Sequence, residues 1–231
     1  MIELFPEGFE ELDHEGDLEL AAYANPSGEE RLWQAFGPGQ SMALAAGWEE
    51  AWKRFHRPVR VGPLWVGPPW EDPHADAIAV VIEPGRAFGT GAHATTRLCL
   101  ELLLDRERTG VVDVGCGSGV LAVAAAKLGF APVSALDLDQ DAVEATAQNA
   151  RVNGVTIGVE RADAVVDPLP EAALALVNVT LETVELVLPR LTATEVVASG
   201  YLAGERPAPP GWEHRERREA EGWAADLYER R

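Results

Sequence analysis

The stretch that decides the fold is Val111-Val112-Asp113-Val114-Gly115-Cys116-Gly117-Ser118-Gly119-Val120-Leu121. An apolar strand ends in an acid, three glycines follow at alternate positions, and an alanine-rich helix then begins. Glycines let the chain turn sharply and let a ligand approach the backbone. The free amide groups at the start of the helix attract polar or anionic ligand atoms. We therefore expect a nucleotide-like ligand on this loop; a tight strand–helix turn without a ligand is the alternative.

Strands and helices alternate on both sides of the glycine loop. An apolar run of strand length at 77–82 and a helix at 93–105 precede it. Further strands are expected at 110–114, 132–137, 156–160, 173–178 and 194–199, with helices at 118–129, 140–152 and 180–189. Strands that are apolar on both faces are typical of a mostly parallel sheet with helices on both sides. The charged tail, 203–231, adds one final strand at 224–228, which we expect to be antiparallel.

The glycine spacing distinguishes between kinds of nucleotide. Dinucleotide sites carry G-x-G-x-x-G, whereas this loop is G-x-G-x-G with Val120 after it, which disfavours a nicotinamide oxidoreductase. Asp137 closes the next strand about 20 residues beyond the glycines, where an acid can accept both ribose hydroxyls. We expect Asp139 to cap the following helix and Asn149 to be a polar group on the surface of that helix.

Three segments of the chain differ in composition. Residues 1–47 form a small acidic lobe, for which we predict a strand at 17–23, a helix from Ser27 through Phe36 and a strand at 42–46. Residues 48–73 are a helix, 48–56, and a Pro/Gly-rich hinge with extended pieces at 59–61 and 64–66. Residues 74–231 are the nucleotide-binding domain. We interpret the lobe as α+β.

Composition narrows the partners and the compartment. The 38 acidic side chains outnumber the 19 basic ones, and residues 1–30 carry ten carboxylates but no Lys or Arg. A net charge of −19 repels phosphate backbones and attracts basic proteins; solubility alone is the alternative explanation. The sequence shows no signal peptide and no apolar run that would span a membrane. The two cysteines form no metal-ligand pair, so we expect no metal and a cytoplasmic protein.

A second stretch is more specific than the glycine loop: Ile82-Glu83-Pro84-Gly85-Arg86-Ala87-Phe88-Gly89-Thr90-Gly91-Ala92-His93-Ala94-Thr95-Thr96-Arg97. Together with the glycine loop, Leu136–Asp139 and Val177-Asn178-Val179, it resembles the bacterial ribosomal protein L11 methyltransferases (the PrmA family). The resemblance covers roughly residues 48–200, and residues 3–36 look like the latter half of that family's N-terminal recognition domain. It implies a Rossmann-like class I methyltransferase fold, S-adenosylmethionine as cofactor, and methylation of lysine ε-amines, with the α-amine as a further target, on a basic ribosomal protein. We expect a monomer.

The resemblance also assigns site residues. Asn178 would be catalytic and would contact the cofactor. The other expected cofactor contacts are Thr96, Asp113, Gly115, Cys116, Gly117, Gly119 and Asp137, with Phe88 and Thr90 on a closing loop and Asp163 at the adenine, unless Asp163 is a surface acid. His93 either acts directly or orders this loop through a hydrogen bond at the start of its helix. The residues after Asn178 are not Pro-Pro-aromatic, which argues against a flipped base as substrate and suits an aliphatic amine.

Departures from the family pattern keep other functions open. The N-terminal lobe is shorter than the family's by about a strand and a helix, the chain after Ser199-Gly200-Tyr201-Leu202 lacks room for the family's further helix, and Thr180 replaces a larger apolar residue. The alternatives are a class I methyltransferase of another protein or a small amine, and a non-catalytic cofactor-binding module.

Overall fold

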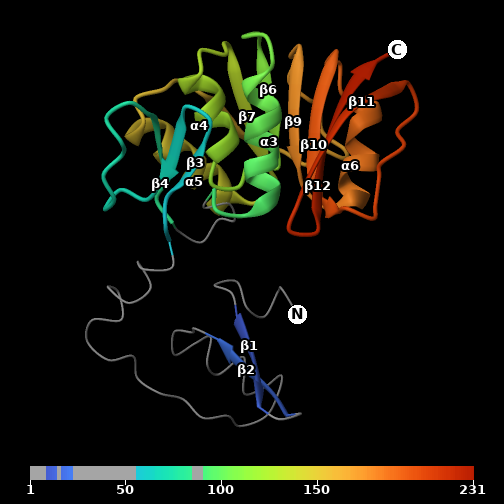
Figure 1. Cartoon of the computed structure of the whole chain (residues 1–231). Coiled ribbons are helices and arrows are strands. Elements are labelled where there is room, and N and C mark those ends of the chain that lie inside the picture. Colours follow the sequence, from blue (N-terminus) through green and yellow to red (C-terminus); the bar gives the residue numbers. More distant parts are fainter. Residues whose placement is uncertain (1–8, 15–16, 23–55, 85–90) are drawn as a thin grey trace. The chain divides into compact units, whose positions relative to one another are not determined.

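A computed structural model of the chain describes residues 9–14, 17–22, 56–84 and 91–231. The chain divides into two compact units, Met1–Trp52 and Lys53–Arg231. In the first unit, β1 (Phe9–His14) and β2 (Asp17–Ala22) form an antiparallel hairpin (Figure 1). The strand predicted at 17–23 is confirmed, whereas β1 was not foreseen because its sequence lacks alternation. The predicted helix from Ser27, the strand at 42–46 and the helix at 48–55 lie outside the described residues.

The second unit is built on a seven-stranded sheet, with strand order β11-β12-β10-β9-β6-β7-β8. β12 is antiparallel to both of its neighbours, β10 and β11. The other neighbouring strands of this sheet, β10-β9-β6-β7-β8, are all parallel. The bounds are β6 (Val111–Val114), β7 (Val133–Asp137), β8 (Gly158–Arg161), β9 (Leu174–Asn178), β10 (Glu195–Leu202), β11 (Trp212–Ala220) and β12 (Trp223–Arg230).

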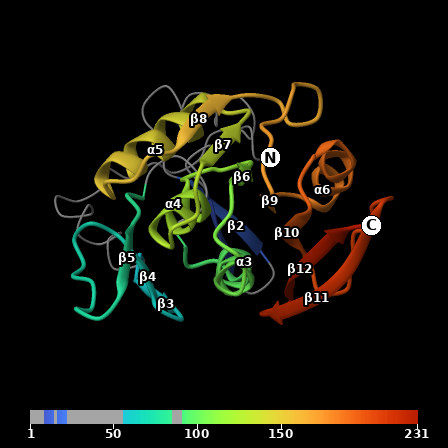
Figure 2. The ribbon, with the colours of Figure 1, turned by 90° about the horizontal axis from the view of Figure 1, so that it is seen from above.

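Helices cover both faces of this sheet. Figure 2 shows α3 (Ala94–Leu104), α4 (Val120–Lys127) and α5 (Gln140–Val152) on one face, and α6 (Leu181–Val187), which continues into the short helix η2 (Leu188–Arg190), on the other. A hydrophobic core lies on each face of the sheet, and alternate residues of β6 belong to one or the other. Val111 packs with α3 and α4, and Val112 packs with α6. The predicted α/β, Rossmann-like fold is confirmed. Within the described ranges, no helix is long and apolar enough to cross a membrane.

The strands before α3 form a separate small sheet. β3 (Val59–Val61), β4 (Leu64–Gly67) and β5 (Ile78–Val81) pair in that order, with β4 and β5 parallel. The sequence predicted strand-like pieces at these positions but placed the first two in a hinge. Side chains of all three strands belong to the main core, where Leu64 of β4 and Val80 of β5 are fully buried.

The C-terminal tail contains one strand more than predicted. β11 and β12 form a hairpin through Glu221 and Gly222, both at positive φ (53° and 79°), as a two-residue turn of this twist requires. β11 was missed because it is rich in charges; they pair across the hairpin and with α3, as in Arg215–Glu229 and Arg218–Asp105. The connection from β10 to β11, Ala203–Gly211, contains no helix, as the sequence indicated.

Candidate active site

A cavity of about 560 Å³ lies at the carboxyl ends of β6, β7 and β9. Ligands of open α/β sheets bind at this edge because the strand–helix loops gather there. Eight of the predicted residues line it: Thr96, Asp113, Gly115, Cys116, Gly117, Asp137, Asp163 and Asn178. Phe88 and Thr90 lie outside the described residues, and Gly119 is not part of the lining.

The glycines of the loop have separate structural roles. Gly115, Gly117 and Gly119 have φ values of 72°, 54° and 79°, which side chains rarely adopt. A Cβ on Gly115 would lie 2.4 Å from Val179 Cγ1, so glycine is required for the loop to meet the segment after β9. A Cβ on Gly119 would lie 2.7 Å from Thr146 Oγ1. Gly119 therefore serves the packing of the loop on α5, and the other two shape the cavity.

Asp137 is fixed at the end of β7 by the loop that it faces. Its Oδ2 accepts from Gly117 N (2.9 Å) and its Oδ1 from Asp139 N (3.0 Å). Each carboxylate oxygen keeps a further lone pair, so Asp137 can still accept hydroxyl groups of a ligand. Asp139 caps α5 by accepting from Asp141 N (3.0 Å), as expected.

Asp113 is the buried acid of the site. Its Oδ2 accepts from Ala122 N at 3.0 Å. Burial raises its pKa to about 7; the hydrogen bond from Ala122 lowers it, and the charge of Asp137 raises it. Below neutral pH, Asp113 is therefore protonated and can act as a hydrogen-bond donor toward the cavity.

Thr96 lies in the cavity lining and carries a buried hydroxyl. Its side chain is 1% exposed, and its Oγ1 has no hydrogen-bond partner among the described residues. A buried hydroxyl without a partner costs about 1–3 kcal/mol. A polar atom of a ligand in the cavity would remove this cost.

The first turn of α3, which carries Thr96, is ordered by His93. The His93 Nδ1 bonds Thr95 Oγ1 (2.8 Å) and caps the helix by accepting from Thr95 N (3.4 Å), while its ring packs edge-on against Trp223 (4.9 Å between centroids). Burial lowers the pKa of His93. The structure thus shows the hydrogen bond at the helix start, which is one of the two roles that the sequence offered for His93.

Asn149 is not the surface group that the sequence predicted. It is fully buried on α5, where its Oδ1 accepts from Glu83 N (3.1 Å) and its Nδ2 donates to Ser118 O (2.8 Å). One turn further on, Asn153 accepts from Val81 N (2.8 Å). The two amides join β5 and its following segment to the glycine loop. Only their i, i+4 spacing on one helix face hinted at this shared role.

Asn178 and Asp163 complete the wall of the cavity. Asn178 ends β9 and is half-buried, and Ser199 of β10 lies beside it in register. Asp163 closes a local turn, because its Oδ1 accepts from Val165 N at 2.9 Å. Asp163 lines the cavity, in which the sequence predicted it as an adenine contact.

Comparison with known proteins shows to which family the chain belongs. The model of the family described as ribosomal protein L11 methyltransferase (PrmA) matches residues 31–225. The chain belongs to this family. The resemblance seen in the sequence is thereby confirmed.

PrmA family relatives cover most of this chain. A ribosomal protein L11 methyltransferase of Symbiobacterium thermophilum is 40% identical over 201 residues, 78% of this chain and 64% of the relative. One of Legionella pneumophila is 39% identical over 174 residues, 69% of this chain and 58% of the relative. The chain thus spans less than two thirds of the length of these relatives. The crystal structure of the ribosomal protein L11 methylase of Lactobacillus delbrueckii subsp. bulgaricus matches with a TM-score of 0.69 and 28% identity, over 76% of this chain and 99% of that one.

The cavity fits the cofactor expected for the PrmA family. S-adenosylmethionine carries ribose hydroxyls, an amino acid group and a base. Partners for these groups are the Asp137 carboxylate and the Thr96 hydroxyl, which has no partner among the described residues. The loop offers space because Gly115 and Gly117 have no Cβ atoms.

Proposed function

We propose that this protein is an S-adenosylmethionine-dependent methyltransferase that modifies lysine ε-amines of ribosomal protein L11. The observation that carries the proposal is the cavity itself. It combines the Asp137 carboxylate at the end of β7, the glycine loop after β6, and the buried hydroxyl of Thr96, which lacks a partner within the described residues. Membership of the PrmA family supports the same activity and substrate.

The proposed roles follow from the contacts of each residue. Asp137 binds the ribose, and the peptide groups of the glycine loop face the amino acid part of the cofactor. Thr96 donates or accepts a hydrogen bond with the cofactor. Asp163 is the candidate contact for adenine. When bound, S-adenosylmethionine supplies an electrophilic methyl group on a sulfonium and a neutral thioether as the leaving group.

The chain's own part in methyl transfer is to align a neutral amine. A free lysine amine has a pKa near 10.4, so it must release its proton to solvent before attack. Apolar lining residues such as Val179 lower that pKa by desolvation. The Asn178 side-chain oxygen, at the end of β9, then accepts a hydrogen bond from the amine and directs its lone pair toward the methyl group. Alignment of this kind accounts for much of the rate enhancement in such displacements.

The charge of the chain favours a basic protein as substrate. The ten carboxylates of residues 1–30 have no Lys or Arg among them, and opposite charge raises the rate at which partners meet. A ribosomal protein substrate places the reaction in the cytoplasm, and we propose that the enzyme acts as a monomer.

The test is intact-mass spectrometry of unmethylated ribosomal protein L11 incubated with this protein and S-adenosylmethionine. We expect a ladder of added methyl groups. Asp137→Asn removes the negative charge and replaces one of the two acceptor oxygens by an NH2 group, which should weaken cofactor binding about tenfold or more. Asp139→Asn is the matched control, because it removes the same charge two residues away while asparagine still caps α5.

Each other outcome corrects a defined part of the proposal. An unchanged L11 mass, with cofactor binding measured by calorimetry, would discard the substrate in favour of another protein or a small amine. Absence of cofactor binding would overturn the proposal as a whole. Equal effects of the two substitutions would remove Asp137 from its role.

A further inference from the structure

β10 contains a bulge directly beside the candidate site. Ser199 pairs with Ala225 of β12 and Tyr201 with Ala224, so Gly200 is the extra residue between them. Gly200 has φ +99°, and a Cβ there would lie 1.8 Å from Val179 O and 2.6 Å from Val179 C. The backbone of the bulge therefore lies against the backbone of Val179, the residue that follows Asn178, and a Cβ on Gly200 would also lie 2.9 Å from Val179 N. Val179 N also donates to Ser199 O at 3.1 Å.

The side chain of the same residue, Val179, lies against the glycine loop. Val179 Cγ1 occupies the space where a side chain of Gly115 would stand, 2.4 Å from the ideal Cβ position. Val179 is thus held between two glycines, one on β10 and one after β6. A shift of the bulge moves Val179, and with it the neighbouring Asn178 in the cavity wall.

A buried carboxylate fixes the bulge in place. Tyr201, the residue after Gly200, donates from its hydroxyl to Asp226 Oδ2 at 2.8 Å. Arg217 binds both oxygens of Asp226, with Nε–Oδ1 and Nη2–Oδ2 distances of 2.9 Å, and His214 Nε2 lies 2.7 Å from Oδ1. Arg217 also donates to the carbonyls of Ala203 (2.9 Å) and Glu205 (2.6 Å). These bonds hold the chain just beyond the bulge.

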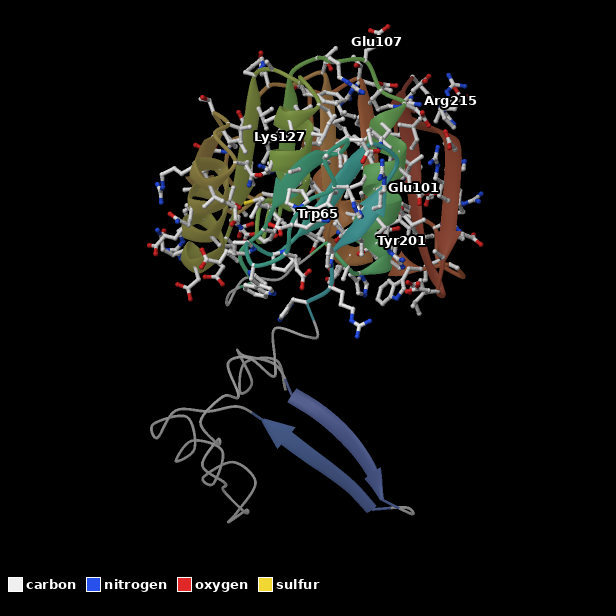
Figure 3. The ribbon with its side chains drawn as sticks, turned by 60° about the vertical axis from the view of Figure 1, so that its left-hand side comes forward. Trp65, Glu101, Glu107, Lys127, Tyr201 and Arg215 are labelled. Carbon is white, nitrogen blue, oxygen red and sulfur yellow. The ribbon has the colours of Figure 1, made fainter. Side chains whose placement is uncertain are left out.

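The charge of Asp226 is maintained by these partners. The side chain is fully buried, and burial raises its pKa, but the hydrogen bonds from Arg217, Tyr201 and His214 outweigh this and hold the pKa below its ordinary value. Figure 3 shows Tyr201 toward the lower end of the sheet, with Glu107 and Arg215 at the opposite end.

We propose that the bulge at Gly200, held by Tyr201 on the Asp226 carboxylate, is the positioning element that sets the Asn178–Val179 peptide in the wall of the cavity. Its effect on methyl transfer rests on the proposed function, but its effect on the peptide does not. Tyr201 acts through Gly200 and Val179 and is a positioning residue.

Tyr201→Phe is the decisive substitution, since Gly200→Ala risks a chain that does not fold. Tyr228→Phe is the matched control. Tyr228 is also buried and also loses one hydroxyl, but that hydroxyl donates to Pro207 O (2.8 Å) and reaches the carboxylate only through the hydroxyl of Tyr201. Two readouts are needed: amide hydrogen exchange of Val179 by NMR, with β6 amides as internal reference, and kcat at saturating cofactor and L11.

We expect Tyr201→Phe to speed exchange at Val179 about fivefold relative to β6, the effect of one lost hydrogen bond, and to lower kcat by a similar factor. Cofactor affinity should change less than kcat. Tyr228→Phe should lower Tm comparably while leaving Val179 exchange, relative to β6, and kcat unchanged.

Unchanged exchange at Val179 in Tyr201→Phe would overturn the proposal, whatever the enzyme does to L11. Equal kcat values for the two variants and the parent protein would reduce the bulge to a structural role. Failure of the parent protein to methylate L11 would instead count against the proposed function, and the exchange data would still judge the bulge.

Discussion

Replacement of Thr96 by valine should move stability and cofactor affinity in opposite directions. Valine keeps the shape of threonine and exchanges the hydroxyl for a methyl group. The Thr96 hydroxyl is buried and has no partner within the described part of the chain, which costs about 1–3 kcal/mol. Removing it should therefore stabilise the protein without cofactor by about 1 kcal/mol, which raises Tm by about 2–4 °C for a chain of this size.

The same substitution should weaken cofactor binding. A hydrogen bond to a neutral cofactor atom contributes about 1 kcal/mol, or about fivefold in Kd, and one to a carboxylate contributes from about tenfold upward. Differential scanning calorimetry without cofactor and isothermal titration with S-adenosylmethionine measure the two effects.

Thr95→Val is the control next to Thr96. The Thr95 hydroxyl is equally buried but bonds His93 Nδ1 at 2.8 Å. Its loss should lower Tm and leave the cofactor Kd near that of the parent protein. A Thr96→Val protein that is less stable than its parent, or that binds the cofactor equally well, would refute the reasoning.

Three further predictions concern catalysis, pH and salt. Asn178→Ala should lower kcat for L11 more than it raises the cofactor Kd, since Asn178 is proposed to orient the amine; equal losses would remove that role. Asp113→Asn should gain stability over the parent protein as the pH rises from about 4 to about 7. The pKa of Asp113 is about 7 in the folded protein, whereas an Asp in the unfolded chain has a pKa near 3.9. As the pH rises, the unfolded chain therefore loses this proton first. The free energy of unfolding of the parent protein falls by up to about 4 kcal/mol across this range, and the variant does not lose it. Melting curves of both proteins at pH 4 and pH 8 test this, and a constant difference in Tm would contradict it. If residues 1–30 attract a basic substrate, kcat/KM for L11 should fall about tenfold from low to high salt. A kcat/KM that does not change with salt would mean that the charge of the acidic lobe contributes only to solubility.

The features that could be predicted from sequence depend on local chemistry. Positive φ values demanded the glycines at Gly115 and Gly117, and their spacing identified the loop. Asp139 caps its helix through a bond to the residue two positions away, so its neighbours in sequence revealed this role. His93 makes a similar bond, which was one of the two roles that the sequence left open.

The features that were missed depend on distant pairing. Asn149 bonds Glu83 N across 66 positions of sequence, and no pattern on its own helix reveals that partner. β11 is a strand because it pairs with β12 along its whole length, and its charges meet those of β12 and of the end of α3, whereas its own sequence is polar. An apolar run at 77–82 indicated a strand but could not indicate which sheet it joins.

The connection from β10 to β11 has almost no slack. The two strands point the same way with β12 between them, so Ala203–Gly211 must carry the chain back along the full length of the sheet. The 8 residues of β10 extend about 26 Å, and the nine residues of the connection reach about 30 Å when extended. Nine helical residues would cover only about 14 Å. The length of this segment therefore forbids a helix and tolerates insertion better than deletion, and any pull on it would be transmitted to the carbonyls of Ala203 and Glu205, which Arg217 holds.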